Sequence, residues 1–263
     1  MTHLFKTTAR WLGLLCLCFS ALHVSANQLD DITQRGVLVV AVPQDFPPFG
    51  SVGPDLQPMG YDIDVARYLA DSLKLKLELV PVTSANRIPY LQTRKVDLVI
   101  SSMGKNPERE KVVDFSRAYA PFFLGVFGEA AAKVDSSADL ADKTVGVTRG
   151  SVEDLELSKL APGSAVIRRF EDNNTTISAY LSGQVDLIAT GNLVAAKIAE
   201  RSSRRDLTSK FVIKNSPCFV GVRKGEAQLL DKVNELITAG LASGKLDGLS
   251  LKWFKAKLPA DLK

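Results

Sequence analysis

Two successive blocks of alternating strand and helix patterns constrain this fold more than any other feature of the sequence. The first block has apolar or alternating runs typical of strands, separated by helix patterns such as Val65, Leu69 and Leu73 on one face. Its strands are expected at 36–42, 75–79 and 98–100, and its helices at 62–73 and 84–93. The second block repeats the order, with strands at 144–147, 165–169 and 185–189 and helices at 152–160, 174–181 and 190–200. Each block predicts a parallel sheet covered by helices, so the chain is of the α/β class.

The aromatic-rich stretch 115–128 is expected to cross from the first block to the second. Short strands at 211–213 and 219–222 and helices at 227–241 and 246–254 complete the chain. In open parallel sheets, ligands bind beyond the carboxyl ends of the strands. Two such units facing each other therefore predict a cleft between two domains, which is a common site for small ligands.

Residues 1–26 have the pattern of a cleavable export signal. Lys6 and Arg10 precede an apolar run at 11–22, which is too short to span a bilayer comfortably, and cleavage is expected after Ala26. An N-terminal membrane anchor is the alternative. Cleavage would remove two of the 33 basic residues and none of the 29 acidic ones, lowering the net charge of +4 by two. The signal predicts a periplasmic location.

Composition excludes several kinds of chemistry. Both histidines, His3 and His23, lie in the export segment, which argues against Ser-His or Cys-His catalysis and against histidine metal sites. One cysteine, Cys218, remains after cleavage and is expected to be a buried apolar residue without a disulfide. We find no phosphate loop, dinucleotide motif or basic run, so neither a cofactor nor a nucleic acid is expected.

The segment 97–116 carries the strongest sign of a ligand site. A buried strand leads to Ser101, Ser102 and Gly104, and a helix is expected to begin after Asn106, a residue typical of N-caps. Arg109 then falls in the first helical turn. Small polar residues, free amides at a helix start and a guanidinium suit a carboxylate. An ordinary strand–turn–helix connection with a surface arginine is the alternative.

Several motifs along the chain together resemble one known family. The motifs are Phe-Pro-Pro-Phe at 46–49, Gly-Tyr-Asp-Ile-Asp-Val-Ala at 60–66, the segment 101–116, Val-Gly-Val with Gly-Ser at 145–151, and the segments 221–224 and 252–254. With them the chain resembles the bacterial extracellular solute-binding proteins, family 3, which are the periplasmic receptors of ABC importers for polar amino acids. The resemblance covers nearly the whole chain after residue 26.

This resemblance implies a periplasmic binding protein-like fold with two α/β domains joined by two crossover strands. The first domain would take residues 27–122 and 220–263, and the second would take residues 123–219. The implied function is to bind a polar amino acid or similar small carboxylate in the cleft. A monomeric receptor would then deliver that ligand to an ABC permease in the inner membrane, and no bond would be made or broken.

The resemblance also implies a set of ligand-binding residues. Arg109, the hydroxyl or amide of Ser102, and Ser151 from the second domain would hold the ligand's α-carboxylate. Phe46 would cover the side chain of the ligand. The set also includes the hydroxyl of Ser101 and the amide of Gly104.

Two glycines depart from the family's pattern. Gly104 stands where many members carry a hydroxyl, and Gly191 stands where the family places an aspartate that pairs with the ligand's α-ammonium. A glycine cannot pair with a cation. Either Asn192, Asp45 or another acid replaces the aspartate, or the ligand has no α-ammonium.

Some residues and functions stay open at the level of the sequence. Arg87 would either face the cleft or brace the packing between elements. Some relatives of this fold are cyclohexadienyl dehydratases acting on prephenate or arogenate, and Glu153 or Glu171 would then be the acid. A sensor whose closed form docks on a membrane receptor would use the same cleft.

Overall fold

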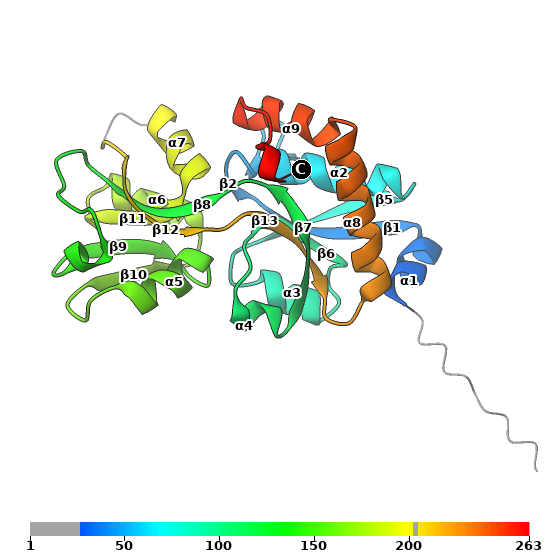
Figure 1. Ribbon diagram of the computed structural model, residues 1–263, viewed down its shortest axis with the longest axis horizontal. Helices are drawn as coiled ribbons and strands as arrows, with labels where there is room; N and C mark the ends of the chain where they lie inside the picture. Colours follow the sequence, from blue (N-terminus) through cyan, green and yellow to red (C-terminus); the bar gives the residue numbers. More distant parts are fainter. Residues whose placement is uncertain (1–26, 202–204, 263) are drawn as a thin grey trace, which may run out of the picture.

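The computed structural model describes residues 27–201 and 205–262, which form two α/β domains side by side (Figure 1). The export signal predicted at 1–26 lies outside the described residues. No helix in the described ranges combines the length and apolar character needed to cross a membrane.

The first domain is built on a five-stranded sheet with the order β5-β1-β6-β13-β7. These strands are β1 (Val37–Pro43), β5 (Lys76–Val82), β6 (Leu98–Met103), β7 (Val113–Ala120) and β13 (Cys218–Arg223). Its helices are α1 (Gln28–Arg35), α2 (Tyr61–Ser72), α3 (Arg87–Gln92), α4 (Pro107–Glu110), α8 (Ala227–Ala242), α9 (Lys245–Phe254) and the 3-10 turn η2 (Ala260–Leu262). A small sheet of β2 (Asp45–Phe46), β3 (Gly50–Val52) and β4 (Pro58–Met59) follows β1.

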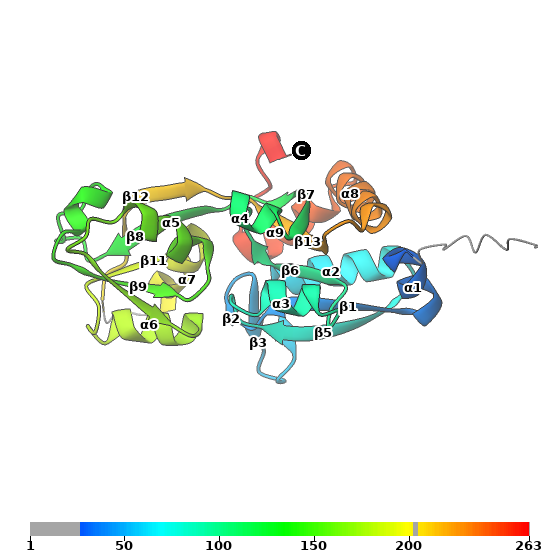
Figure 2. The same cartoon turned by 90° about the horizontal axis from the view of Figure 1, so that it is seen from below.

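Side chains alternate across the first sheet, which explains why its strands read as continuous apolar runs. Val40 and Val42 of β1 join the core that α2 covers, whereas Ala41 joins a second core with Leu91 of α3. Burial on both faces favours strands without polar positions. Figure 1 shows α2 above β6 and α3 below it, and Figure 2 shows the same domain from the side of α3.

The second domain has a five-stranded sheet with the order β10-β9-β11-β8-β12. Its strands are β8 (Phe123–Gly128), β9 (Thr144–Thr148), β10 (Val166–Phe170), β11 (Leu187–Gly191) and β12 (Thr208–Asn215). Its helices are α5 (Val152–Leu160), α6 (Asn173–Leu181), α7 (Asn192–Arg201) and the 3-10 turn η1 (Ser137–Leu140).

The chain crosses between the sheets twice, from β7 to β8 and from β12 to β13 (Figure 1). The two crossovers lie side by side, since the amide of Ser216 donates to the carbonyl of Phe122 at 2.9 Å. Such paired connections form a natural hinge. We propose domain limits close to these crossovers, near the limits of 122 and 220 expected from the sequence.

The strands expected in the two blocks pair in parallel, as predicted, and the crossover strands add antiparallel pairs to both sheets. Strand β13 runs antiparallel to β6 and β7, and β8 runs antiparallel to β11 and β12. Strands β7 and β8, which the sequence indicates only as a crossing segment, were not predicted, and neither were α1 and the small sheet. Each crossover thus contributes its own antiparallel strands to both domains.

Candidate functional site

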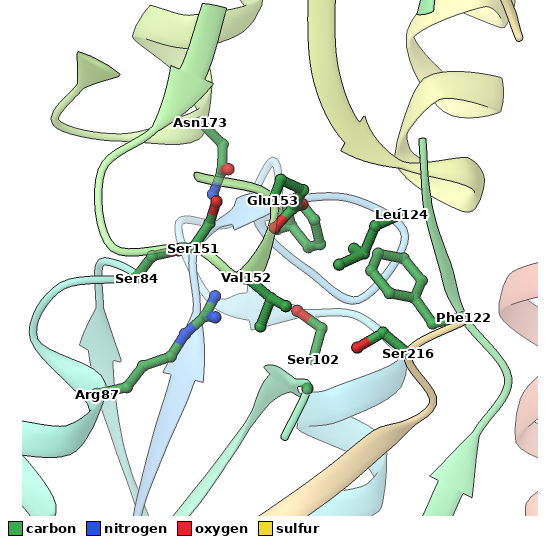
Figure 3. Close-up of a pocket in the computed structure, with 12 residues that line it drawn as sticks. Ser84, Arg87, Ser102, Phe122, Leu124, Ser151, Val152, Glu153, Asn173 and Ser216 are labelled. Carbon is green, nitrogen blue, oxygen red and sulfur yellow. The ribbon is translucent and has the colours of Figure 1, made fainter. Parts of the chain in front are cut away.

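A small cavity lies between the two domains, beyond the carboxyl ends of β5, β6 and β9 (Figure 3). It leaves only about 10 Å³ for the centres of water molecules, which is roughly the space that one water needs. The two domains are therefore closed over it. Its lining residues are Phe46, Ser84, Arg87, Ser102, Gly104, Phe122, Leu124, Ser151, Val152, Glu153, Asn173 and Ser216.

Ser102 lies at the end of β6 and faces this cavity. It has φ of 42°, an uncommon backbone conformation for a residue with a side chain. Its amide donates to the Asp62 carboxylate at 2.7 Å, and its buried hydroxyl has no hydrogen-bond partner among the described residues. A buried hydroxyl without a partner is costly unless a ligand completes it.

The support beneath Ser102 is the buried carboxyl group of Asp62 in the first turn of α2. It accepts hydrogen bonds from the Ser102 amide and from the Tyr119 hydroxyl, each at 2.7 Å. Burial raises the pKa of Asp62 to about 7 despite these two bonds. The sequence had indicated a helix-start residue here, and the structure adds this contact with Ser102.

Arg109 does not line the cavity. Asn106 caps α4 as expected, since its side chain accepts from the Arg109 amide at 2.9 Å. The guanidinium of Arg109 donates to the carbonyls of Gly104 at 2.7 Å and Gly150 at 2.9 Å. Burial, and then the charge of Arg87, lowers its pKa to about 10. Arg109 thus joins the two domains, because Gly104 belongs to the first domain and Gly150 to the second. The nitrogens that were expected to bind a carboxylate donate to these two carbonyls instead.

Arg87, at the start of α3, supplies the guanidinium that faces the cavity (Figure 3). Its Nε donates to the hydroxyl of Ser101 at 3.0 Å, which fixes its direction. Its two terminal nitrogens donate no hydrogen bond to any of the described residues. The side chain is 6% exposed, and burial lowers its pKa. Of the two alternatives for Arg87, the structure shows the one facing the cleft, and it places Ser101 behind this arginine.

The second domain contributes Ser151 and Glu153 at the start of α5. The hydroxyl of Ser151 caps the helix by accepting from the Asp154 amide at 3.1 Å, and Glu153 is 6% exposed. Burial raises the pKa of Glu153, while the charges of Arg87 and Arg109 oppose that rise. The cavity therefore contains one guanidinium and one carboxyl group.

Gly191 and Asn192 lie apart from the cavity lining. A Cβ placed on Gly191 would overlap the ring of Phe122, so this ring fills the space of the missing side chain. The Asn192 side chain accepts from the Phe123 amide at 3.1 Å and steadies the first crossover. Neither position offers a cavity partner for an ammonium group in this conformation.

The two remaining acids considered for the site have other partners. Asp45 accepts from the amide of Asn173 at 2.7 Å and from its side chain at 3.1 Å, which joins the domains a second time. Glu171 is exposed and pairs with Arg149 at 2.8 Å. Glu153 is thus the acid that lines the cavity.

Aromatic rings close the remaining side of the cavity. The rings of Phe46 and Phe122 meet edge to face with centroids 6.0 Å apart. Phe46 was among the residues predicted from the sequence, whereas Phe122, Ser84 and Ser216 were not. Ser84 follows the expected strand at 75–79, so the rule of strand carboxyl ends could have found it. No comparable signal marked the crossover residues. Within the described ranges, we find no cluster of acidic, histidine or cysteine residues suited to a metal ion.

Comparisons with known proteins agree with this architecture. A family model described as bacterial extracellular solute-binding proteins, family 3, matches residues 38–256. The ABC transporter glutamine-binding protein GlnH of Bacillus subtilis (strain 168) is 29% identical, covering 87% of this chain and 85% of the relative.

Two solved structures share the fold. A mutant of ArgBP from T. maritima has a TM-score of 0.81 and 31% identity, covering 86% of this chain and 99% of its own. The ancestral amino acid-binding protein AncCDT-1, described as a precursor of cyclohexadienyl dehydratase, has a TM-score of 0.79 and 36% identity, covering 87% of this chain and 100% of its own. The chain belongs to the bacterial extracellular solute-binding proteins, family 3, and is a solute-binding protein that acts outside the cytoplasm.

Proposed function

We propose that this protein is the periplasmic receptor of an ABC importer and that its ligand is a small amino acid bound as a zwitterion. The observation that carries the proposal is the pair of opposite charges in one closed cavity. Arg87 from the first domain and Glu153 from the second both line it. The ABC transporter protein GlnH and the binding proteins of similar structure support the class of ligand.

Arg87 is assigned the carboxylate of the ligand. A planar guanidinium binds two carboxylate oxygens at once, and its terminal nitrogens face the cavity. Ser84 and Ser102, which also belong to the first domain, line the same cavity. A carboxylate there would satisfy the Ser102 hydroxyl, which lacks a partner in the described residues.

Glu153 is assigned the ammonium group that Gly191 cannot hold. A buried carboxyl group becomes costly to ionise without a nearby cation, and an ammonium beside Glu153 would lower that cost. The aromatic rings of Phe46 and Phe122 would enclose the rest of the ligand.

The remaining residues expected to bind the ligand take supporting or edge positions in this proposal. Gly104 and Ser151 line the cavity, so their contact with the ligand is retained. Ser101 acts through Arg87, Asn192 acts through the first crossover, and Arg109 holds the closed state through Gly150.

Closure of the domains would signal that a ligand is bound. Arg109 with Gly150, and Asp45 with Asn173, are polar contacts that exist only when the domains meet. A ligand that contacts both domains adds to these contacts and shifts the protein toward the closed form. We propose that the closed monomer delivers its ligand to a membrane permease.

A thermal-shift panel tests this proposal. Each of the twenty L-amino acids and a set of acids without an amino group, such as propionate and succinate, is added at 1 mM. A ligand of micromolar affinity adds about 4 kcal/mol to the free energy of unfolding. The proposal fails if no amino acid raises the melting midpoint, or if only the acids without an amino group do.

Two variants assign the charges. Arg87→Met should weaken binding of the best amino acid by about 10- to 100-fold, the scale of a lost charge-assisted hydrogen bond. Arg149→Met, which removes an exposed arginine, is the matched control and should bind normally. Glu153→Gln should reduce the preference for an amino acid over the matching acid without an amino group. Unchanged preference in this variant would refute the ammonium assignment.

A further inference from the structure

The second crossover brings a hydroxyl into the cavity that the ligand assignment above does not use. Ser216 lies between β12 and β13, is 3% exposed and lines the cavity. We find no hydrogen bond to its hydroxyl from the described residues. Figure 3 shows this hydroxyl on the cavity side of the crossover, facing Ser102.

Gly104 and Ser216 share one space. A Cβ built on Gly104 would overlap the Oγ of Ser216, and its next neighbour would be a methyl group of Val152 at 3.3 Å. Any side chain at position 104 would therefore displace the Ser216 hydroxyl. Because Gly104 has no side chain, the Ser216 hydroxyl can occupy this space and line the cavity.

The backbone holds Ser216 in this place. Its amide donates to the carbonyl of Phe122 in the first crossover at 2.9 Å, and Pro217 follows it and restricts the chain. Because both crossovers define the hinge, the position of the Ser216 hydroxyl depends on the angle between the domains.

We propose that Ser216 is a ligand-binding residue that contacts a polar group of the amino acid from the hinge itself. This inference rests on the proposed function, because it deepens the description of the same cavity. A serine hydroxyl can accept a hydrogen bond from the ammonium group or donate one to a carboxylate oxygen, because it is both a donor and an acceptor. Since this contact forms at one hinge angle, it couples ligand binding to domain closure.

Three variants test this role with the same panel, each L-amino acid at 1 mM as a separate probe. Ser216→Ala should weaken binding of the best amino acid about tenfold. Gly104→Ser should weaken binding further, because its side chain overlaps the Ser216 hydroxyl. The double variant with Gly104→Ser and Ser216→Gly moves the hydroxyl to the residue that follows β6 and should bind better than Gly104→Ser alone. Ser209→Ala, an exposed serine of β12, is the matched control.

The outcomes separate the two proposals. Melting midpoints without ligand show whether each variant folds, and the double variant tests the shared space even if Gly104→Ser is unstable. Wild-type binding that is lost in Arg87→Met but unchanged in Ser216→Ala would overturn the role of Ser216 and leave the proposed function intact. A wild-type chain that no panel member stabilises would refute the proposed function and this role together.

Discussion

The buried carboxyl group of Asp62 makes a prediction about stability and pH that follows directly from its surroundings. Its pKa rises from 3.8 to about 7 because burial disfavours the charged form. In the unfolded chain the group returns to its ordinary range. The folded protein therefore binds this proton more tightly than the unfolded chain does.

The sign and size of the effect follow from that difference. A raised pKa contributes stability that is complete below about pH 4 and is lost as pH rises through about 7. A difference of roughly three pKa units corresponds to roughly 4 kcal/mol in the free energy of unfolding. Near the group stand the Ser102 amide, the hydroxyl of Tyr119 and, farther away, the charge of Arg87, and all three favour ionisation.

Asp62→Asn isolates this contribution. An asparagine in the same position accepts from the Ser102 amide with its oxygen and donates to the Tyr119 hydroxyl with its nitrogen, so both bonds persist. Urea unfolding of both proteins is measured from pH 4.5 to 8. The wild type should lose stability relative to Asp62→Asn as pH rises, by about 3 kcal/mol over this range.

A matched control separates this effect from the general loss of a negative charge. Asp71→Asn removes an exposed carboxylate from the same helix, and its difference from wild type is subtracted at each pH. Glu153 titrates in both proteins and cancels in the comparison. A difference between wild type and Asp62→Asn that stays constant across this pH range would refute the reasoning.

Three further variants have defined outcomes. Arg109→Met should weaken ligand binding and favour the open form in small-angle X-ray scattering, because its hydrogen bond to Gly150 is removed; a radius of gyration equal to that of the wild type, with and without ligand, would contradict this. Gly191→Ala should lower stability by about 1–3 kcal/mol in urea unfolding, since its Cβ overlaps the ring of Phe122, and normal stability would show that the ring moves freely. Asn106→Ala should cost about 1 kcal/mol through the lost N-cap of α4, and no change in the urea midpoint would rule out that contribution.

Sequence patterns predicted the elements whose side chains alternate or repeat strongly. The strand at 36–42 was predicted because its side chains are buried on both faces of the first sheet and it is therefore apolar throughout. The helix was predicted because Val65 and Leu69 repeat on the face that packs on this sheet. Strands β7 and β8 were missed, because aromatic and turn-forming residues at 115–128 resemble a connection. Strand direction was also beyond a local pattern, since β13 enters the first sheet from the other domain.

The site residues show a similar division. Phe46, Ser102, Gly104 and Ser151 line the cavity because each lies at or just beyond a strand's carboxyl end, which sequence order alone can place. The direction of a long side chain cannot be read this way. Arg109 reaches backbone carbonyls, whereas a hydrogen bond to Ser101 directs Arg87 toward the cavity.

The two glycines that depart from the family's pattern have a common physical explanation. The sequence shows that a glycine has no side chain, but it does not show which neighbouring residue occupies the space that a side chain would fill. Here Phe122 fills the space beside Gly191, and Ser216 fills the space beside Gly104. Both of these residues belong to the crossovers, and their backbones bond to each other. The two crossovers thus supply cavity side chains at the two positions where glycine has none, so groups that line the cavity lie in the segments that join the domains.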